Sequence, residues 1–491
     1  MLKPKLHLQR EEVERGLRMI IVDGLGSEVV VCLTSGAFLV GLAIMLGASN
    51  FQIGLLAAFP TLTNLTQVFS VMLIRAYPNR RVITVFSLML ARLPLCFVGL
   101  LLYIGDGIGV HMLLLLMFVH YLFSSLAGAG WNSWVKDLVP EERLGRYFSK
   151  RSRYMQTTNI VLSLAVAWIV DAVGSGNPER LPYLYGIYFL VAGITGLLGA
   201  YFLSKAPEPQ SFFTAGNLLK LLELPLRNDN FRRLLWFNGA WVFAINLAIP
   251  FFSVFLLKSL GLSMTAVILL TVVGQVFSVL TIQLWGKLSD KYSNKSIISL
   301  AAPIYILCIL CWIFVGIYSR TALNIMLLFL LYMFTGVSTA GINLALTNIG
   351  LKLAPKTDAV VYISIKNIVT AFFSSMGPIV GGWLADFFAV RELRITIEWI
   401  SPGVREAVKL IYLHEWNFLF LIAAVLAFFS LRLLGRIKEN GEVGHMLVKR
   451  IMKTRFKSNM KEAFIIGNLM TWHSQIRAIL RRKTTDGGAK A

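Results

Sequence analysis

The chain has 491 residues, of which 56% are hydrophobic, and its mean hydropathy is +0.69. Soluble domains do not sustain such hydropathy over this length, so a soluble globular protein is excluded. The formal net charge of +22 would suit a nucleic-acid-binding protein, but the positive charge sits in alternate gaps between apolar segments. That distribution is typical of membrane topology, and no nucleic-acid partner is expected.

Apolar segments of roughly 20 residues, the length of helix that crosses about 30 Å of hydrocarbon, follow one another along most of the chain. Only a helix satisfies its own backbone hydrogen bonds in that medium. The fold class predicted is therefore an all-α membrane protein with twelve transmembrane helices. The predicted spans are residues 18–46, 51–74, 82–104, 110–132, 154–173, 182–204, 233–257, 264–286, 295–318, 322–347, 358–389 and 412–434.

The lysines and arginines predict the orientation of these spans. Of the 47 in the chain, 38 lie before the first span, in alternate loops or after the last span, whereas seven lie in the opposite loops. Because cytoplasmic loops carry the excess of positive charge, both termini are predicted to be cytoplasmic. The first span directly follows a charged and polar start, so no cleavable signal peptide is expected.

Short sequence matches recur in the same order in the two halves of the chain. Four matches at separations of 208 to 215 residues predict duplication of a six-span unit. They are QVFSV at 67–71 and 275–279, Tyr77–Arg80 and Tyr292–Lys295, Gly47–Ser49 and Gly261–Ser263, and Pro140–Arg151 and Pro355–Lys366. The expected units are a first half (1–204), a cytoplasmic connector with a short amphipathic helix around Leu218–Leu224 (205–232), a second half (233–435) and a tail (436–491).

The loop after the eighth predicted span carries the most specific motif. It reads Gly286-Lys-Leu-Ser-Asp290-Lys291-Tyr-Ser-Asn-Lys295, and it resembles the G-x-L-x-D-[RK]-x-G-[RK]-[RK] loop of the major facilitator superfamily of secondary transporters. The resemblance implies two six-helix halves related by an axis along the membrane normal. It also implies a cytoplasmic gate in which Gly286 permits close helix approach, Asp290 accepts from a helix N-terminus or a cation, and Lys291 and Lys295 take part. A plain positively charged turn is the alternative.

A second loop joins the fourth and fifth predicted spans. It contains Asp137-Leu-Val-Pro140 and Gly145-Arg146, and it looks like the D-x-x-P-x-x-x-x-G-R loop of some bacterial members of the superfamily. We expect Asp137 to form an ion-pair cluster with Arg146 and Arg151 at the inner mouth. Solvated loop charge is the alternative.

Two carboxylates lie within the first predicted span. Glu28 is about 15 Å along the helix from Arg18, which is close to the midplane. Charge is costly there, so Glu28 is expected either to couple transport to a proton or cation, to bind substrate, or to serve as a structural partner. Asp23 lies on another face and nearer the cytoplasm, and it is a weaker candidate for the same roles.

Three basic residues also lie within predicted spans. His120 stands where family members often carry arginine, and it is either a titratable functional group or a structural histidine. Arg92 falls in the third span, which the resemblance makes peripheral, so a structural partner or a snorkelling cation is expected. Lys366 is the repeat equivalent of Arg151, and a gate or interface role is favoured over substrate binding.

Neutral polar residues in the second half are candidates to line a cavity or to bond between helices, namely Asn246, Gln275, Asn343 and Asn367. All four cysteines lie in apolar segments, so metal sites and cofactors are not expected. No nucleotide-binding loop is present, which argues against direct ATP drive.

The tail after residue 436 mixes basic clusters with apolar residues such as Phe464 and Trp472. This pattern predicts amphipathic helices on the anionic inner leaflet. The chain as a whole is interpreted as a monomeric secondary transporter of a small solute, with a proton or cation as candidate coupling ion, in the cytoplasmic membrane. A non-transporting scaffold or sensor that acts through its tail is the competing class.

Overall fold

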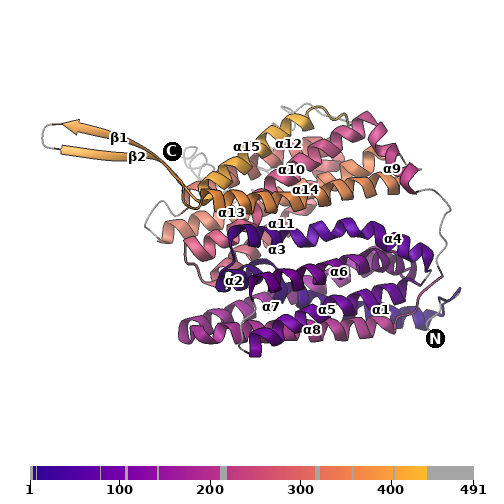
Figure 1. Cartoon of the computed structure of the whole chain (residues 1–491). Coiled ribbons are helices and arrows are strands. Elements are labelled where there is room, and N and C mark those ends of the chain that lie inside the picture. Colours follow the sequence, from indigo (N-terminus) through magenta and orange to yellow (C-terminus); the bar gives the residue numbers. More distant parts are fainter. Residues whose placement is uncertain are drawn as a thin grey trace, which may run out of the picture.

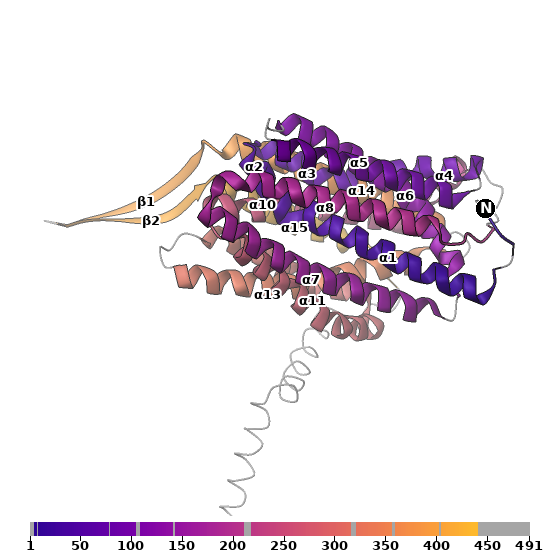
Figure 2. The same ribbon diagram turned by 90° about the horizontal axis from the view of Figure 1, so that it is seen from below.

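The computed structural model is a bundle of long helices that run roughly side by side, with one hairpin that projects from its end (Figures 1 and 2). The residues that the structure describes are 4–6, 8–77, 79–104, 109–140, 143–210, 218–315, 321–355, 359–401 and 404–439. The N-terminal segment lies at the end opposite the hairpin. We call these two ends of the bundle the terminal end and the hairpin end.

Eleven helical stretches within the described ranges are long and apolar enough to cross a membrane. They are α1–α2 (Arg10–Thr34 and Gly36–Met45), α5 (Arg80–Ile104), α6 (Val110–Leu138), α7 (Leu144–Gly176), α8 (Leu181–Ser204), α10 with η4 (Asp229–Val254 and Phe255–Ser259), α11 (Met264–Tyr292), α12 with η5 (Asn294–Cys311 and Trp312–Phe314), α13 (Thr321–Leu353), α14 (Ala359–Phe388) and α15 (Trp416–Leu434). Each lies on a predicted span, so the prediction of these helices is confirmed.

The second predicted span is divided rather than continuous. It comprises α3 (Asn50–Leu62), the 3-10 turn η1 (Thr63–Thr66) and α4 (Gln67–Ala76). Pro60 lies inside α3, and a proline removes one backbone hydrogen bond and crowds the preceding turn. The hydroxyl of Thr63 donates to the carbonyl of Phe59 at 2.8 Å, in addition to the backbone N–H of Thr63. The first span is also interrupted, since Ser35 between α1 and α2 is extended (φ −139°, ψ −179°).

A two-stranded hairpin departs from the all-α prediction. Strands β1 (Glu392–Ser401) and β2 (Val404–His414) pair antiparallel from Glu392↔His414 to Ser401↔Val404, with an irregularity after Ile395. They project beyond the helices between α14 and α15 (Figures 1 and 2). The segment is rich in isoleucine and valine, which favour strands. The last helix was predicted to begin at residue 412. It begins at Trp416, because β2 occupies the residues up to His414.

The connector contains a helix, as predicted. Helix α9 (Leu218–Arg227) lies between α8 and α10 in the chain, and the hydroxyl of Tyr362 on α14 donates to the carbonyl of Leu224 at 3.4 Å. The ring of Tyr362 also packs edge-on against Phe231 at the start of α10. These contacts fix the end of the connector against the second half of the chain.

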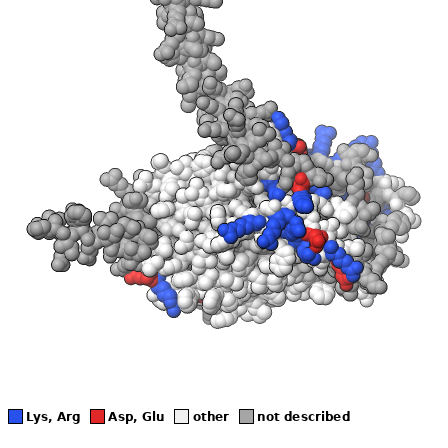
Figure 3. All heavy atoms as spheres, turned by 90° about the horizontal axis from the view of Figure 1, so that it is seen from above, with Lys and Arg blue, Asp and Glu red and all other residues white. Residues whose placement is uncertain are grey.

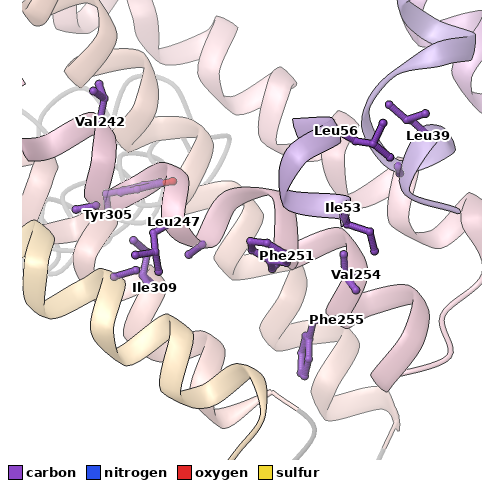
Figure 4. Packing of buried hydrophobic residues seen from close by; sticks show 14 of the residues in the cluster. Leu39, Ile53, Leu56, Val242, Leu247, Phe251, Val254, Phe255, Tyr305 and Ile309 are labelled. Carbon is purple, nitrogen blue, oxygen red and sulfur yellow. The ribbon is translucent and has the colours of Figure 1, made fainter. Parts of the chain in front are cut away.

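The first and second halves of the chain pack against each other near the hairpin end. Helix α3 packs along α14, α7 meets α11, and α10 contacts α2. Figure 4 shows Ile53 of α3 beside Val254 of α10, with Phe251 and Leu56 close by. Ile53 is only 1% exposed, so this apolar contact seals the interface between the halves.

Charged residues gather away from the hairpin. In Figure 3, most lysines and arginines on the visible face lie over its middle and toward the terminal end, whereas the surface nearer the hairpin is mostly uncharged apart from one small group of acidic and basic side chains. Apolar side chains such as Phe86, Phe97 and Leu307 are more than half exposed on the bundle surface. In a membrane protein, such side chains face lipid.

Candidate functional site

The largest cavity among those described, about 1090 Å³, lies between the halves. Its walls come from α1 and α7 of the first half and from α11 and α13 of the second. A smaller cavity of about 270 Å³ shares Asn159, Thr271 and Gln275 with it and extends toward Ser35. Together they form a space between helices of the two halves that is lined by both polar and apolar side chains, which is a usual place for a solute site.

Glu28 lies in this cavity. Its Oε1 accepts a hydrogen bond from Nδ2 of Asn159 on α7 at 2.8 Å. No cation among the described residues forms an ion pair with it. A half-buried carboxylate with only a neutral partner can accept hydrogen bonds from the cationic group of a ligand. Glu28, which was predicted as a coupling or binding residue, therefore lines the cavity, and its role stays a prediction.

The opposite wall carries one amide and several hydroxyls among apolar side chains such as Val276 and Leu280. Gln275 of α11 and Thr335 and Thr339 of α13 line the cavity. Helices α11 and α13 are in backbone contact behind this wall, because a Cβ placed on Gly336 would lie 2.1 Å from the carbonyl oxygen of Gly274. The wall therefore offers neutral hydrogen-bond donors and acceptors from two tightly packed helices.

Arg151 connects the central cavity with a smaller one inside the first half. It lines the 1090 Å³ cavity and also a cavity of about 230 Å³ that contains Asp23. Its guanidinium lies 4.8 Å from the ring centroid of Trp131, a cation–π contact. Gly24 leaves room for it, since a Cβ there would lie 3.0 Å from Nη2. Arg151 is thus held between Asp23 and the central cavity.

Asp23 is 3% exposed and lies between two cations. Arg92 of α5 and Arg151 are the positive charges that act on it. Arg92 is 7% exposed, its Nη2 lies 3.4 Å from the Ser27 hydroxyl, and its buried Nε lacks a hydrogen-bond partner. Arg92 therefore points into the first half, and the snorkelling alternative is wrong for it. Gly196 of α8 makes room, because a Cβ there would meet the Arg92 Cδ at 2.7 Å.

Most of the other predicted polar residues lie apart from the cavities. His120 is buried and its Nδ1 lies 2.7 Å from the carbonyl of Ala91. Asn246 donates to Val242 of its own helix, and the Nζ of Lys366 donates to the carbonyl of Leu346 at 2.6 Å. Asn343 is exposed, and neither it nor Asn367 lines any of the cavities described above. Gln275 is the one of the neutral candidates that reaches the central cavity.

The loop cluster predicted around Asp137 is formed with a different partner. Oδ2 of Asp137 accepts from Nη1 of Arg80 at 2.5 Å, whereas Arg146 is exposed and Arg151 faces the cavities. The pairing with Arg146 and Arg151 was wrong because α7 begins at Leu144 and carries both arginines away from the end of α6.

Glu208, which the sequence analysis did not single out, organises the same region. It is 2% exposed, and its two oxygens accept from the backbone N–H groups of Arg80 and Arg81 at 2.8 and 3.2 Å. It also pairs with the side chain of Arg80 at 3.3 Å. The segment after α8 is thereby fastened to the first residues of α5, which carry the positive end of the helix dipole.

Glu439 makes the equivalent contact in the second half. Its oxygens accept from the backbone N–H groups of Asn294 and Lys295 at 3.2 and 2.8 Å, and Lys352 lies 3.4 Å away. Nζ of Lys295 donates to the carbonyl of Ile437 at 2.6 Å. A glutamate follows shortly after both the sixth and the twelfth predicted span, and this repetition could have indicated the two caps from the sequence.

The remaining motif residues lie at the exposed end of α11. Asp290 forms no ion pair with any residue in the described ranges, and the Nζ of Lys291 lies 5.3 Å from the ring of Tyr292. Gly286 was predicted to permit close helix approach. A Cβ on it would meet the Leu344 Cδ2 at an ordinary 3.8 Å, so the prediction is wrong for this structure. Here α13 is already far enough from α11 to admit a side chain.

These features match a known family. The sequence model of the Major Facilitator Superfamily matches residues 25–356 and 239–444. The chain belongs to the Major Facilitator Superfamily. Its family and its long apolar helices make it a multi-pass membrane protein.

Individual relatives agree with this family. The MFS-type transporter YxiO of Bacillus subtilis (strain 168) is 25% identical over 290 residues, which are 55% of this chain and 64% of that protein. The chain thus spans less than two thirds of the length of the curated relative that it matches. Solved structures with a similar fold include a mutant of the nucleoside transporter NupG (TM-score 0.65, 12% identity, 86% of this chain and 100% of that one) and the inward-open xylose transporter XylE from E. coli (TM-score 0.59, 13% identity, 87% and 96%).

Proposed function

We propose that this protein is a proton-coupled secondary transporter that moves a small polar solute by alternating access. The observation that carries the proposal is the half-buried carboxylate of Glu28 in a cavity between the two halves, with the neutral amide of Asn159 as its partner. Such a carboxylate changes its charge when a proton or a cationic ligand group arrives, and a charge change in a cavity of this kind alters the balance between two conformations.

The solute is proposed to bind between Glu28 and the wall of Gln275, Thr335 and Thr339. That wall offers neutral hydrogen bonds, which suits a solute rich in hydroxyl, amide or amine groups. Arg151 and Arg153 line the cavity together with Glu28, so the described charges there are two positive and one negative. A polyanion would need several more fixed cations, so we expect neutral or zwitterionic solutes, or solutes with one charged group, and not polyanions.

Asp23 is proposed as a second charge that responds to the occupancy of the cavity. Arg151 lies between Asp23 and the central cavity, so a ligand that attracts its guanidinium withdraws a cation from Asp23. Arg92 remains beside Asp23 in either case. The cluster would thus link the state of the cavity to the packing of α1, α5 and α7.

The membrane topology proposed is twelve spans with both termini in the cytoplasm, in the cytoplasmic (inner) membrane, as a monomer. The divided helix α3–η1–α4, from Asn50 to Ala76, is counted as the second span and raises the number from eleven to twelve. The terminal end is the cytoplasmic one, because it carries the excess of lysine and arginine. Asp290 and Lys291 are proposed to act as a cytoplasmic gate. Their contacts are expected to form only in an outward-open state, in which the terminal end is closed. The tail, which lies outside the described residues, is proposed to bind anionic lipid.

Counterflow in proteoliposomes tests the transport function. Solutes are first chosen by thermal shift of the purified protein from a panel of nucleosides, sugars, amino acids and amines. Vesicles preloaded with an unlabelled hit should then accumulate its labelled form transiently, and the double variant Thr335→Ala/Thr339→Ala should weaken this exchange. The absence of both thermal shifts and counterflow across the panel would favour the scaffold or sensor class.

A further inference from the structure

Asp171, near the end of α7, holds the start of a helix in the other half. Its Oδ1 accepts from the backbone N–H of Met264 and its Oδ2 from that of Thr265, each at 2.7 Å. These are the first two residues of α11. The free N–H groups of a first turn, together with the helix dipole, favour a negative charge at this place.

Asp386, near the end of α14, makes the same contact in the opposite direction. Its Oδ1 accepts from the backbone N–H of Asn50 at 3.0 Å and its Oδ2 from that of Phe51 at 2.9 Å. Asn50 and Phe51 are the first two residues of α3, which belongs to the first half. Each half therefore donates a carboxylate and receives one.

The sequence repeat explains why two backbone donors are available in each helix. The serines that precede α3 and α11, Ser49 and Ser263, cap their own helices by accepting from the N–H of the third helical residue at 3.2 Å. The amides of the first two residues are left for a partner. The repeated glycines Gly47 and Gly261 have φ of 77° and 61°, a left-handed backbone that glycine adopts without strain, just before each serine.

The four residues follow the internal repeat. Asp171 and Asp386 are 215 residues apart, and Ser49 and Ser263 are 214 apart, the same separations as the sequence matches. Both contacts cross between halves, and both lie near the hairpin end, where α7 and α14 finish. At the terminal end, Glu208 and Glu439 cap α5 and α12 in the same manner but within one half. In the described part of the chain, no carboxylate joins the halves at the terminal end.

We propose that Asp171 and Asp386 are paired latches that hold the hairpin end of the cleft closed, and that both release when the cleft opens at that end. The inference rests on the proposed alternating access. Because two rigid halves cannot separate at one end while either contact remains, the free energies of the two latches act on a single opening equilibrium. Loss of one latch should then expose residues beside the other.

Cysteine labelling of the purified, full-length protein tests this proposal without any solute or gradient. Two reporters are used, Ile53→Cys on α3 beside the Asp386 latch and Val267→Cys on α11 beside the Asp171 latch. Both wild-type side chains are at most 1% exposed. The measured quantity is the rate of reaction with a water-soluble maleimide. The four native cysteines are replaced by serine or alanine in the background, and circular dichroism checks that each variant is folded.

If both latches act on one opening equilibrium, each cysteine reporter should respond to loss of the distant latch, which we call cross-reporting. Asp171→Ala should raise the labelling rate of Ile53→Cys about tenfold, and Asp386→Ala should do the same for Val267→Cys, because hydrogen bonds to a charged group are lost in each case. In the double variant the two factors should multiply. Glu439→Ala removes a similar cap within one half and serves as the matched control, with both labelling rates unchanged.

Two results would overturn the proposal. One is a rise confined to the reporter beside the altered aspartate, which would indicate local fraying of one helix start. The other is an equal rise in the Glu439→Ala control, which would indicate general loosening. If the cross-reporting holds but no solute is transported, then the latches are retained and the proposed transport function fails on its own.

Discussion

Glu208 and Glu439 make the same contact in the two halves of the chain: each carboxylate accepts the backbone N–H groups of two successive residues at the start of a helix. They differ in their cationic partners. Arg80 beside Glu208 is fully buried, whereas Lys352 beside Glu439 is half exposed. The same cap is therefore built with a desolvated ion pair in one half and a solvated one in the other.

The first prediction follows from this difference. Glu208→Gln should lower stability by about 3–5 kcal/mol, because it leaves the Arg80 guanidinium buried with less compensation. Glu439→Gln should cost less, since the charge of Lys352 is partly solvated. Thermal melts in detergent measure the difference, and Glu14→Gln, which breaks only the exposed pair with Arg143, is the control. Equal melting temperatures for the two glutamate variants would contradict this account.

The second prediction separates the two carboxylates of α1 by stability. Asp23→Asn should destabilise the protein by about 3–5 kcal/mol, because Arg92 then lacks its compensating charge in a buried site. Glu28→Gln should change stability by less than about 1.5 kcal/mol, since a glutamine can still bond to Asn159. The measurement is again the melting temperature in detergent without solute. A larger loss for Glu28→Gln would mean that Glu28 is the structural group.

The third prediction concerns the contact of α3 with α14. A Cβ on Gly54 would lie 2.3 Å from the carbonyl oxygen of Pro378, so Gly54→Ala must force these helices apart. Overpacking of this kind costs about 1–3 kcal/mol, and here it falls on the interface between the halves. The labelling rate of Val267→Cys should rise. Gly336→Ala, whose clash lies between α11 and α13 of one half, should lower the melting temperature without raising that rate.

The fourth prediction concerns the tail. A peptide covering residues 445–483 should gain helix with vesicles of anionic lipid and little with neutral ones, because each basic residue near an anionic surface contributes about 1 kcal/mol. Added salt should weaken the binding. Circular dichroism with the two vesicle types measures the effect, and equal binding to both would refute the electrostatic part.

The sequence predicted what depends on hydropathy and repetition. The helix positions and the connector helix follow from apolar periodicity and counting. Asp171 and Asp386 are also 215 residues apart, so the repeat makes them equivalent positions. The sequence prediction did not include them. A helix N-terminus favours a negative charge, but the local sequence does not indicate which distant aspartate provides it.

Other features required tertiary structure. The segment of β1 and β2 reads as an ordinary loop in a chain dominated by helices, and each strand is defined only by its pairing with the other. Arg92 was expected at the periphery, but the glycines of α8 create an interior space for it. Asp137 was assigned to arginines near it in sequence, and the start of α5 proved closer.

Glu28 is proposed to couple solute movement to protons. Proteoliposomes with a trapped pH-sensitive dye are given a solute that shows counterflow, and the internal pH is followed in the wild type, in Glu28→Gln and in the Glu14→Gln control. We expect solute-driven proton movement in the wild type and the control, and counterflow without proton movement in Glu28→Gln. Proton movement of wild-type size in Glu28→Gln would contradict the account.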